Sequence, residues 1–323
     1  MSELQVVEAT PDDAAVIRDV IHAAFAPRPH LDPPSTALAE TAESVAAALD
    51  EHGGLLCRVD GLPAGAVLFD RETVGATTTL ALRRVSAIPH FQARGVASAI
   101  VGVAEEVAAA RGYDDVTLRA RTELPATLVF WERRGYREVW HEGPQVLFGK
   151  ALPVELVAGS ADEARAVGRC LAALCAAGDV VILTGELGAG KTTLTQGLGA
   201  GLGVRGDVTS PTFVISRVHP SLGDGPPLIH VDAYRLGDEA ELDDLDLDAY
   251  VDAGVTVVEW GEGIAEALSD VRLRVHVSRA RGTRVADGPD DTDDPRTVTV
   301  TPLGARWIGA GVRSSMLGCP AFT

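Results

Sequence analysis

Residues 180–199 read Val180-Val-Ile-Leu-Thr-Gly-Glu-Leu-Gly-Ala-Gly-Lys-Thr-Thr-Leu-Thr-Gln-Gly-Leu-Gly199. They open with four apolar, mostly β-branched residues, which is typical of a buried parallel strand. They continue as Gly185-x-x-x-x-Gly190-Lys191-Thr192 and then into leucines at helical spacing. Glycines allow a turn so tight that consecutive backbone N–H groups hold phosphate oxygens, and the following helix adds its positive end. The sequence therefore predicts a phosphate-binding loop between a strand and a helix.

The lysine of this loop is unusual because the chain of 323 residues has only two lysines, Lys150 and Lys191. Lysine is a compact charge on a flexible stem and arginine a planar fork, so the two are not interchangeable around phosphates. We therefore expect Lys191 to reach the outer phosphates of a nucleotide. The Thr192 hydroxyl is expected to ligate magnesium.

Two further apolar runs in this half end in a carboxylate, one at Asp232 and one at Glu259. Ligands of parallel sheets bind at the carboxyl ends of the strands. One carboxylate can hold a metal ion directly or through water, and another can position or deprotonate an attacking water. The simpler alternative is that each carboxylate caps a neighbouring helix.

The length of the chain predicts two domains, and 46% hydrophobic with 23% charged residues predicts a globular protein. A net charge of −18 argues against a surface that binds nucleic acid unaided. No basic start precedes an apolar segment, and no run reaches about 18 apolar residues, so we expect neither secretion nor membrane insertion. The four cysteines, Cys57, Cys170, Cys175 and Cys319, lack zinc spacing. We expect a reduced, cytoplasmic protein.

The first half contains a second candidate anion site, Gln92-x-x-Gly95-x-Ala97, between a predicted strand over Thr77–Val85 and a helix. Free amides at a helix N-terminus make a pyrophosphate seat that needs no lysine. With the strand and helix order and Phe130-Trp131-Glu-Arg-Arg-Gly135-Tyr136 downstream, residues 1–150 resemble the GNAT-type N-acetyltransferase family. The resemblance implies an α+β fold and acetyl-CoA bound by Gln92, Ala93, Arg94, Gly95, Val96 and Ala97.

The sequence departs from that family at the proton donor. A tyrosine often stands in the family where Trp131 stands here, and it protonates the departing thiolate. An indole N–H is too weak an acid to replace a phenol, so Tyr136 or a water chain has to serve. An asparagine common in the family several residues earlier is also missing. Glu72 or Glu123 could act as the base, although a solvated surface carboxylate is the commoner role for glutamate.

The second half carries four ordered motifs, Gly-Glu-Leu-Gly-Ala-Gly-Lys-Thr-Thr, Ser-Pro-Thr-Phe, His-Val-Asp-Ala-Tyr-Arg-Leu and Val-Glu-Trp-Gly. Over residues 154–305 it closely resembles the TsaE family, the ATPase subunit of bacterial tRNA threonylcarbamoyladenosine synthesis. The resemblance implies partners, TsaD and TsaB, which carry the transfer chemistry and the tRNA. It also implies a nucleotide-sensing loop over residues 209–213.

The resemblance places ATP and Mg²⁺ on defined residues. Its phosphate-binding residues are Gly185, Glu186, Leu187, Gly188, Ala189, Gly190, Lys191, Thr192 and Thr193. Its expected metal ligands are Thr192, Asp232 and Glu259. The residues expected to act in catalysis are Lys191, Asp232 and Glu259, together with Tyr136 in the first half.

We expect an α+β GNAT domain at 1–151, an α/β P-loop NTPase domain at 152–307 and a disordered tail at 308–323. A charge-rich loop is expected over 287–294. The first alternative is that the N-terminal domain is an inert acyl-CoA-binding or docking module. The second is that the C-terminal half is a small-molecule kinase, for which an arginine-rich lid and an acceptor base are lacking. The acetyl acceptor is not evident from the sequence.

Overall fold

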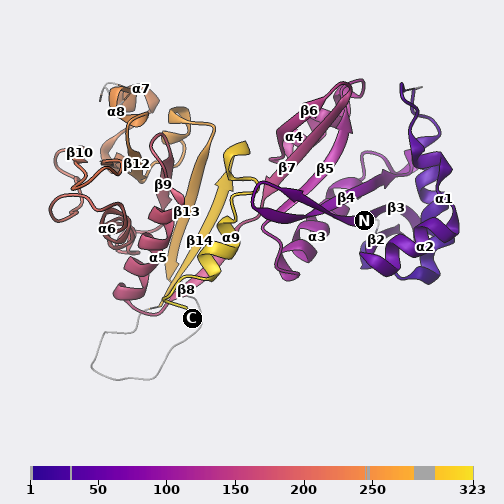
Figure 1. Cartoon of the computed structure of the whole chain (residues 1–323), viewed down its shortest axis with the longest axis horizontal. Helices are drawn as coiled ribbons and strands as arrows, with labels where there is room; N and C mark the ends of the chain where they lie inside the picture. The colour runs from indigo at the N-terminus through magenta and orange to yellow at the C-terminus, as the bar shows by residue number, and fades with distance from the viewer. Residues whose placement is uncertain (1–2, 30, 244, 246–247, 280–294, 323) are drawn as a thin grey trace. The chain divides into compact units, whose positions relative to one another are not determined.

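The computed structural model describes residues 3–29, 31–243, 245, 248–279 and 295–322. The chain forms two compact units, Met1–Leu152 and Pro153–Thr323, each built on its own seven-stranded sheet (Figure 1). The predicted combination of an α+β unit and an α/β unit is confirmed. The charge-rich stretch 287–294 lies outside the described residues.

The sheet of the first unit has the order β1-β2-β3-β4-β5-β7-β6, and among its described residues only β4 and β5 pair in parallel. Strands β2 and β3 form a hairpin around Asp60-Gly61, where both residues have positive φ as a tight hairpin turn requires. The strands are β1 (Leu4–Glu8), β2 (Gly54–Val59), β3 (Leu62–Val74), β4 (Thr77–Ala87), β5 (Asp115–Arg121), β6 (Arg137–Glu142) and β7 (Gln145–Ala151).

Helices cover both faces of this sheet because the strands alternate apolar side chains between the two faces. On one face α1 (Ala14–Phe25) and α2 (Ala42–Glu51) pack against Leu56 of β2 and its neighbours. On the other face α3 (Val96–Ala110) and α4 (Pro125–Arg133) pack against Leu55 and its neighbours. The short helices η1 (Pro11–Asp13), η2 (Thr36–Ala39) and η3 (Pro89–Phe91) complete the unit.

The two central strands of the first unit separate partway along. Pairing between β4 and β5 covers only Leu80–Leu82 against Val116–Leu118, although both strands continue well beyond. A register shift between β3 and β4 and a positive φ of 55° at Arg84 accompany the separation. The ends of β4 and β5 therefore leave an opening within the sheet.

The second unit has the strand order β10-β11-β12-β9-β13-β14-β8. Strands β11, β12, β9 and β13 are mutually parallel, and the flanking strands are antiparallel. Asp232 and Glu259 are register partners at the carboxyl ends of β11 and β12. The strands are β8 (Val154–Ala158), β9 (Val180–Thr184), β10 (Ser216–His219), β11 (Leu228–Asp232), β12 (Val255–Glu259), β13 (Arg272–Arg279) and β14 (Arg296–Leu303).

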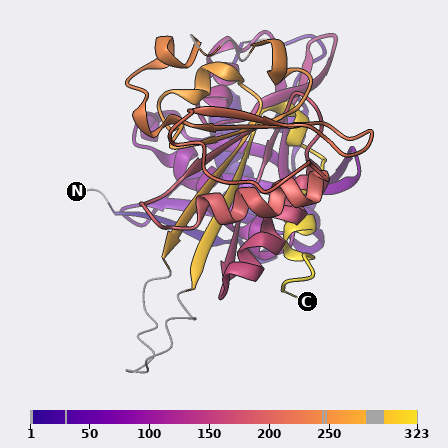
Figure 2. The same ribbon diagram turned by 90° about the vertical axis from the view of Figure 1, so that its left-hand side faces the viewer.

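Two helices of this unit, α5 (Ala161–Leu174) and α6 (Lys191–Leu202), lie side by side with their backbones in contact (Figure 2). A Cβ on Gly197 would lie 2.0 Å from the carbonyl oxygen of Arg165, and one on Gly168 would lie 2.2 Å from that of Leu194. Only glycine permits this approach. Helices α7 (Glu239–Asp243) and α8 (Asp248–Val251), with η4 (Ala233–Arg235) and η5 (Ala265–Leu268), contribute to the apolar core formed with β9, β11 and β12.

The end of the chain corrects two expectations. Residues 308–323 were expected to be disordered, but α9 (Val312–Leu317) follows η6 (Ala305–Trp307) and buries Met316 completely. Cys319, just beyond α9, forms a disulfide with Cys170 of α5, so the expectation of reduced cysteines is wrong for this pair. The tail is too short for its apolar periodicity to be seen in the sequence. Every helix in the described part of the chain is too short or too polar to span a membrane.

Candidate functional sites

The predicted phosphate loop connects β9 to α6 and depends on its glycines. Gly185 has a φ of 137°, and a Cβ there would lie 2.1 Å from the carbonyl oxygen of Val277 in β13. Gly188 and Gly190 also have positive φ, at 74° and 106°. Such angles are readily adopted only by glycine. The loop is therefore held close to the sheet in a conformation that no other residue at position 185 could share.

Lys191 begins α6 and folds back into this loop. Its Nζ donates to the carbonyl oxygens of Gly185 and Glu186, at 2.8 and 3.0 Å, and lies 3.7 Å from the ring centroid of Trp260. Burial lowers the pKa of Lys191, while the nearby carboxylates of Glu259 and Asp232 act in the opposite direction. The ammonium group thus lies inside the loop, where it contacts two carbonyl oxygens and the face of the Trp260 ring.

Glu259 is the centre of a buried polar cluster. Its Oε2 accepts a hydrogen bond from Thr192 Oγ1 at 3.0 Å, and its Oε1 accepts one from Thr195 Oγ1 at 3.4 Å. His230 Nε2 lies 2.9 Å from the same Oε1. Only 3% of Glu259 is exposed, and buried carboxylates of this kind are stable only when hydrogen-bonded. The arrangement fixes the side chain at the edge of the loop.

Asp232 lies on the neighbouring strand and holds a different segment. Its Oδ2 accepts hydrogen bonds from Ser210 Oγ at 3.0 Å and Thr212 Oγ1 at 2.6 Å. Its Oδ1 accepts one from the backbone N–H of Tyr234 at 3.1 Å. The segment 209–213 is therefore tied to this carboxylate by two side-chain hydrogen bonds.

These groups surround a cavity of about 480 Å³. The structure brings together predicted residues from the loop and from both strand ends, whereas Trp260 and Tyr234 were not predicted to line it. His230 was also missed as part of the cluster, although it stands two residues before Asp232 and so shares its face of β11. The lining residues are Leu187, Gly188, Gly190, Lys191, Thr192, Thr193, Ser210, Thr212, Asp232, Tyr234, Glu259 and Trp260.

The donor set fits magnesium bound to a nucleotide better than a metal held by protein alone. Within the described residues no group of three or more His, Cys, Asp or Glu is arranged to hold a metal ion. Magnesium commonly takes one or two protein oxygens and completes its shell with water and phosphate. The adjacent oxygens of Thr192 and Glu259 are of this type.

In the first unit the segment 92–97 forms the turn into α3. Ala93 and Gly95 have positive φ, and α3 starts at Val96 with its first amides free of helical partners. A cavity of about 270 Å³ follows this turn; Arg94 does not line it, and its guanidinium faces the ring of Phe91 instead. The lining residues are Ala87, Phe91, Gln92, Ala93, Gly95, Val96, Ala97, Ser98 and Phe130.

A second cavity of the first unit, of about 480 Å³, opens where β4 and β5 separate, and Trp131 lines it. Tyr136 does not. Its side chain is fully buried and its hydroxyl donates to Glu105 Oε1 at 3.1 Å. Burial, and then the negative charge of Glu105, raise the pKa of Tyr136 well above its usual range. The structure therefore does not bring the expected proton donor to the cleft.

The two candidate bases are also engaged. Glu72 is paired with Arg119. Glu123 accepts hydrogen bonds from Nη2 and Nε of Arg121, at 2.6 and 3.1 Å. The hydrogen bonds from Arg121 lower the pKa of Glu123. A carboxylate in that state is a poor proton acceptor.

Comparisons with known proteins address each unit separately. The sequence model of "Threonylcarbamoyl adenosine biosynthesis protein TsaE" matches residues 158–286, and that of "Acetyltransferase (GNAT) family" matches residues 17–136. The tRNA threonylcarbamoyladenosine biosynthesis protein TsaE of Streptomyces coelicolor is 63% identical over 149 residues, 46% of this chain and 96% of that protein. The Bacillus subtilis protein of the same name is 42% identical over 148 residues, 45% of this chain and 84% of that protein.

Two solved structures are similar to one unit each. The crystal structure of YdiB from Bacillus subtilis aligns with a TM-score of 0.39 and 32% identity, covering 51% of this chain and 93% of that one. The PaiA N-acetyltransferase of Thermoplasma acidophilum, solved in complex with coenzyme A, aligns with a TM-score of 0.38 and 12% identity. It covers 46% of this chain and 99% of that one.

Proposed function

This chain belongs to the TsaE family through its second unit and carries a GNAT-family domain in its first, and from that premise we propose that it is a magnesium-dependent ATPase joined to an acetyl-CoA-dependent N-acetyltransferase. Its family places the second unit in threonylcarbamoyladenosine modification of tRNA. The observation that carries the ATPase proposal is the convergence of Lys191, Thr192, Asp232 and Glu259 on one cavity.

Each of these residues has a distinct role in the proposed hydrolysis. Lys191 exchanges the carbonyl oxygens of its own loop for phosphate oxygens, which are stronger acceptors because they are charged. Thr192 and Glu259 would hold the magnesium ion, which when bound would neutralise charge on the phosphates. Asp232 positions or deprotonates the attacking water, and Ser210 and Thr212 hold its carboxylate by hydrogen bonds.

A protein partner for this unit is supported by apolar side chains around the cavity. Phe213, Leu187 and Tyr234 are 87%, 81% and 61% exposed. Large exposed apolar groups gathered at one place indicate a protein interface. We assign this surface to the TsaD and TsaB subunits, which would bring the tRNA, since the negative charge of the chain disfavours direct RNA binding.

The test is ATP hydrolysis by the purified full chain, alone and with TsaB, TsaD and tRNA. Hydrolysis that is weak alone and raised by the complex, with modified adenosine accumulating, is the expected result. Rapid hydrolysis unaffected by those partners would instead favour a small-molecule kinase. Tryptophan fluorescence during nucleotide titration gives a second readout, because Trp260 lies against Lys191.

For the first unit, the turn at 92–97 supports acetyl-CoA binding through backbone amides at the start of α3. In the proposed transfer, the acceptor amine bonds to the thioester carbonyl carbon, the C–S bond breaks, and the amine loses the proton that the thiol gains. Water carries that proton, because Trp131 is a weak acid and Tyr136 is buried elsewhere.

Two measurements separate a transferase from an inert acyl-CoA-binding module. Calorimetry with acetyl-CoA measures binding, and thiol release in the presence of amines measures transfer. Binding together with amine-dependent thiol release is expected. Binding without release from any amine would favour the inert module.

A further inference from the structure

The cavity between β4 and β5 is lined by arginine to an unusual degree. Five arginines are among its lining residues, together with apolar residues such as Leu31 and Leu118, and none of the lining residues is acidic. This is unexpected in a chain whose net charge is −18. The five arginines are Arg28, Arg83, Arg84, Arg119 and Arg121.

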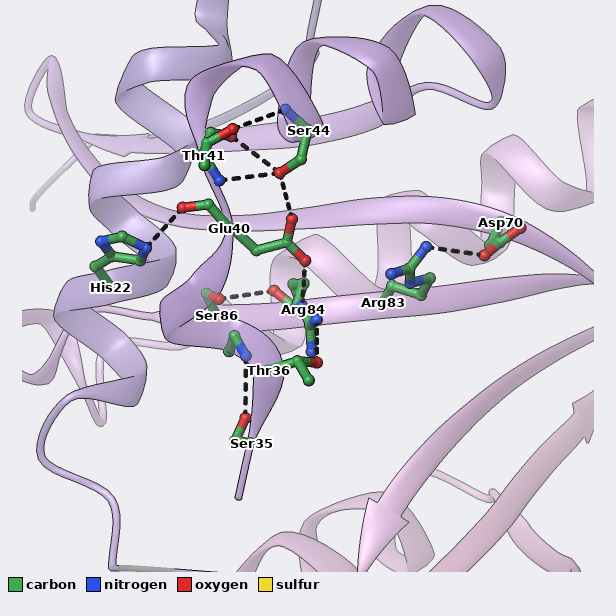
Figure 3. A network of polar contacts seen from close by, with 11 residues as sticks. His22, Ser35, Thr36, Glu40, Thr41, Ser44, Asp70, Arg83, Arg84 and Ser86 are labelled. Carbon is green, nitrogen blue, oxygen red and sulfur yellow. Dashed lines mark hydrogen bonds and ion pairs between the residues drawn. The ribbon is translucent and has the colours of Figure 1, made fainter. Parts of the chain in front are cut away.

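Four of these arginines already have a carboxylate partner. Figure 3 shows Arg84 reaching Glu40 on one side of the network and Arg83 pointing to Asp70 on the other, with nitrogen–oxygen distances of 2.8 and 3.1 Å. Glu40 also accepts a hydrogen bond from Ser44 Oγ, so both of its carboxylate oxygens have a partner. Arg119 and Arg121 are paired with Glu72 and Glu123.

Arg28 is different. Within the described part of the chain no carboxylate lies within ion-pair distance of its guanidinium, whose nearest described partner is the ring of Phe25, 3.6 Å from centroid to Cζ. Burial lowers the pKa of Arg28, which reflects the cost of keeping its charge away from water. A buried cation is costly unless an anion or an aromatic face compensates it. Phe25 compensates only part of that cost.

The position of this charge relative to the acetyl-CoA turn is informative. Phe130 lines the cavity beside residues 92–97, and the next residue, Trp131, lines the arginine-rich cavity. Residues from the final part of β4, Leu82–Ala87, also line both cavities. The arginine-rich cavity therefore begins where the acetyl group would arrive and extends to Arg28.

We propose that this cavity binds an acetyl acceptor that is an amine carrying its own carboxylate or phosphate, and that Arg28 binds that anionic group. The proposal rests on the acetyltransferase function assigned above, whose substrate class it names. A basic peptide N-terminus is disfavoured, because like charges placed together across an interface are strongly unfavourable. A planar guanidinium suits either anion, because both accept two parallel hydrogen bonds.

The experiment measures the binding of acetylated products, so it does not depend on turnover. Calorimetry on the full chain with coenzyme A compares N-acetyl-L-phenylalanine with its uncharged amide. A second arm compares O-phospho-N-acetylethanolamine with N-acetylethanolamine, and distinguishes a phosphate from a carboxylate. We expect at least one anion to bind tenfold or more tightly than its neutral counterpart.

Substitutions locate the effect. Arg28→Ala should remove the preference for the anion, and Arg28→Lys should retain part of it because the charge remains. Arg18→Ala is the matched control, since Arg18 lies on α1 and pairs with Asp19 outside the cavity. Equal affinity for anion and neutral counterpart, no binding of either anion, or a preference that survives in Arg28→Ala would overturn the proposal. Anion binding without any acetyl transfer would instead contradict the transferase function and leave the anion site standing.

Discussion

His230 and Glu259 form a buried pair, with His230 Nε2 2.9 Å from Glu259 Oε1 and 0% and 3% of their side chains exposed. They lie on adjacent parallel strands, and the other carboxylate oxygen of Glu259 accepts from Thr192. The imidazole therefore orients the carboxylate that faces the phosphate loop. Because an ionised carboxylate only accepts hydrogen bonds, an ionised Glu259 requires the proton of the imidazole on His230 Nε2.

Replacing His230 with alanine should lower ATP turnover more than ATP affinity. A hydrogen bond to a charged group contributes about 1.5–3 kcal/mol, which corresponds to about 10- to 160-fold in rate. The measurement is kcat and KM for ATP, with thermal unfolding to confirm the fold. His219→Ala is the control. His219 is also buried, and its ring centroid lies 6.4 Å from that of His230, but it makes no described contact with Glu259. Equal effects of the two substitutions would contradict the orienting role.

Replacing Lys191 with alanine should abolish nucleotide-dependent function, because the loop loses the cation that reaches the phosphates. Glu259→Ala should spare nucleotide binding better than hydrolysis. Nucleotide titration and phosphate release measure the two effects. Lys150→Ala is the natural control, since it removes the other lysine, which pairs with Glu105 in the first unit. Normal hydrolysis in both Lys191→Ala and Glu259→Ala would refute the site assignment.

Replacing Gly197 with alanine should destabilise the second unit by about 1–3 kcal/mol or more, because the added methyl group would overlap the backbone of α5. Gly102→Ala, in the interior of α3, is the matched change without a clash, since a Cβ there meets nothing within 4 Å. It should stabilise the first unit by about 0.4–1 kcal/mol. Calorimetric unfolding of each variant provides the comparison; similar shifts for both would argue against the close crossing of α5 and α6.

We expect ionisation of Tyr136 to lower the free energy of unfolding at alkaline pH. Its pKa is raised in the folded chain, so the unfolded chain loses the phenolic proton first, near pH 10. The stability contributed by the neutral phenol is fully present below that pH and is lost as the pH rises toward the folded pKa. Tyr136→Phe should flatten this decline in alkaline unfolding experiments. The same substitution should leave acetyl transfer intact. A loss of transfer in a folded variant would show that Tyr136 takes part in the reaction.

The grouping of residues at the proposed nucleotide site was largely predictable because its sequence signals are local. The loop, the strand before it and the carboxylates at two strand ends lie in short runs whose patterns are distinctive, and parallel strands bring their ends together. The role of His230 was visible in principle from its spacing to Asp232. The hydrogen bonds of Ser210 and Thr212 to Asp232 were not, because they depend on how a loop returns to the sheet.

The first unit was predictable in its elements but not in its cavity. Separation of β4 from β5 depends on which residues pair across strands far apart in sequence, and no local pattern specifies it. The charge at Arg28 was likewise hidden, because the sequence shows an arginine without showing which carboxylates reach it. The ordered tail depends on packing against α5 and β8, which are remote in sequence.

The near absence of lysine has a consequence for the chain's own chemistry. Lys191 is folded against loop carbonyl oxygens, and Lys150 is paired with Glu105 with 26% of its side chain exposed. In the proposed acetyltransferase, the acetyl thioester thus meets hardly any side-chain amine of its own chain that could compete as an acceptor. We therefore expect little acylation of the chain's own lysines. For the same reason, labelling of Lys191 by an amine-selective reagent, read against the label on Lys150 as the one other lysine, measures whether the phosphate loop is occupied.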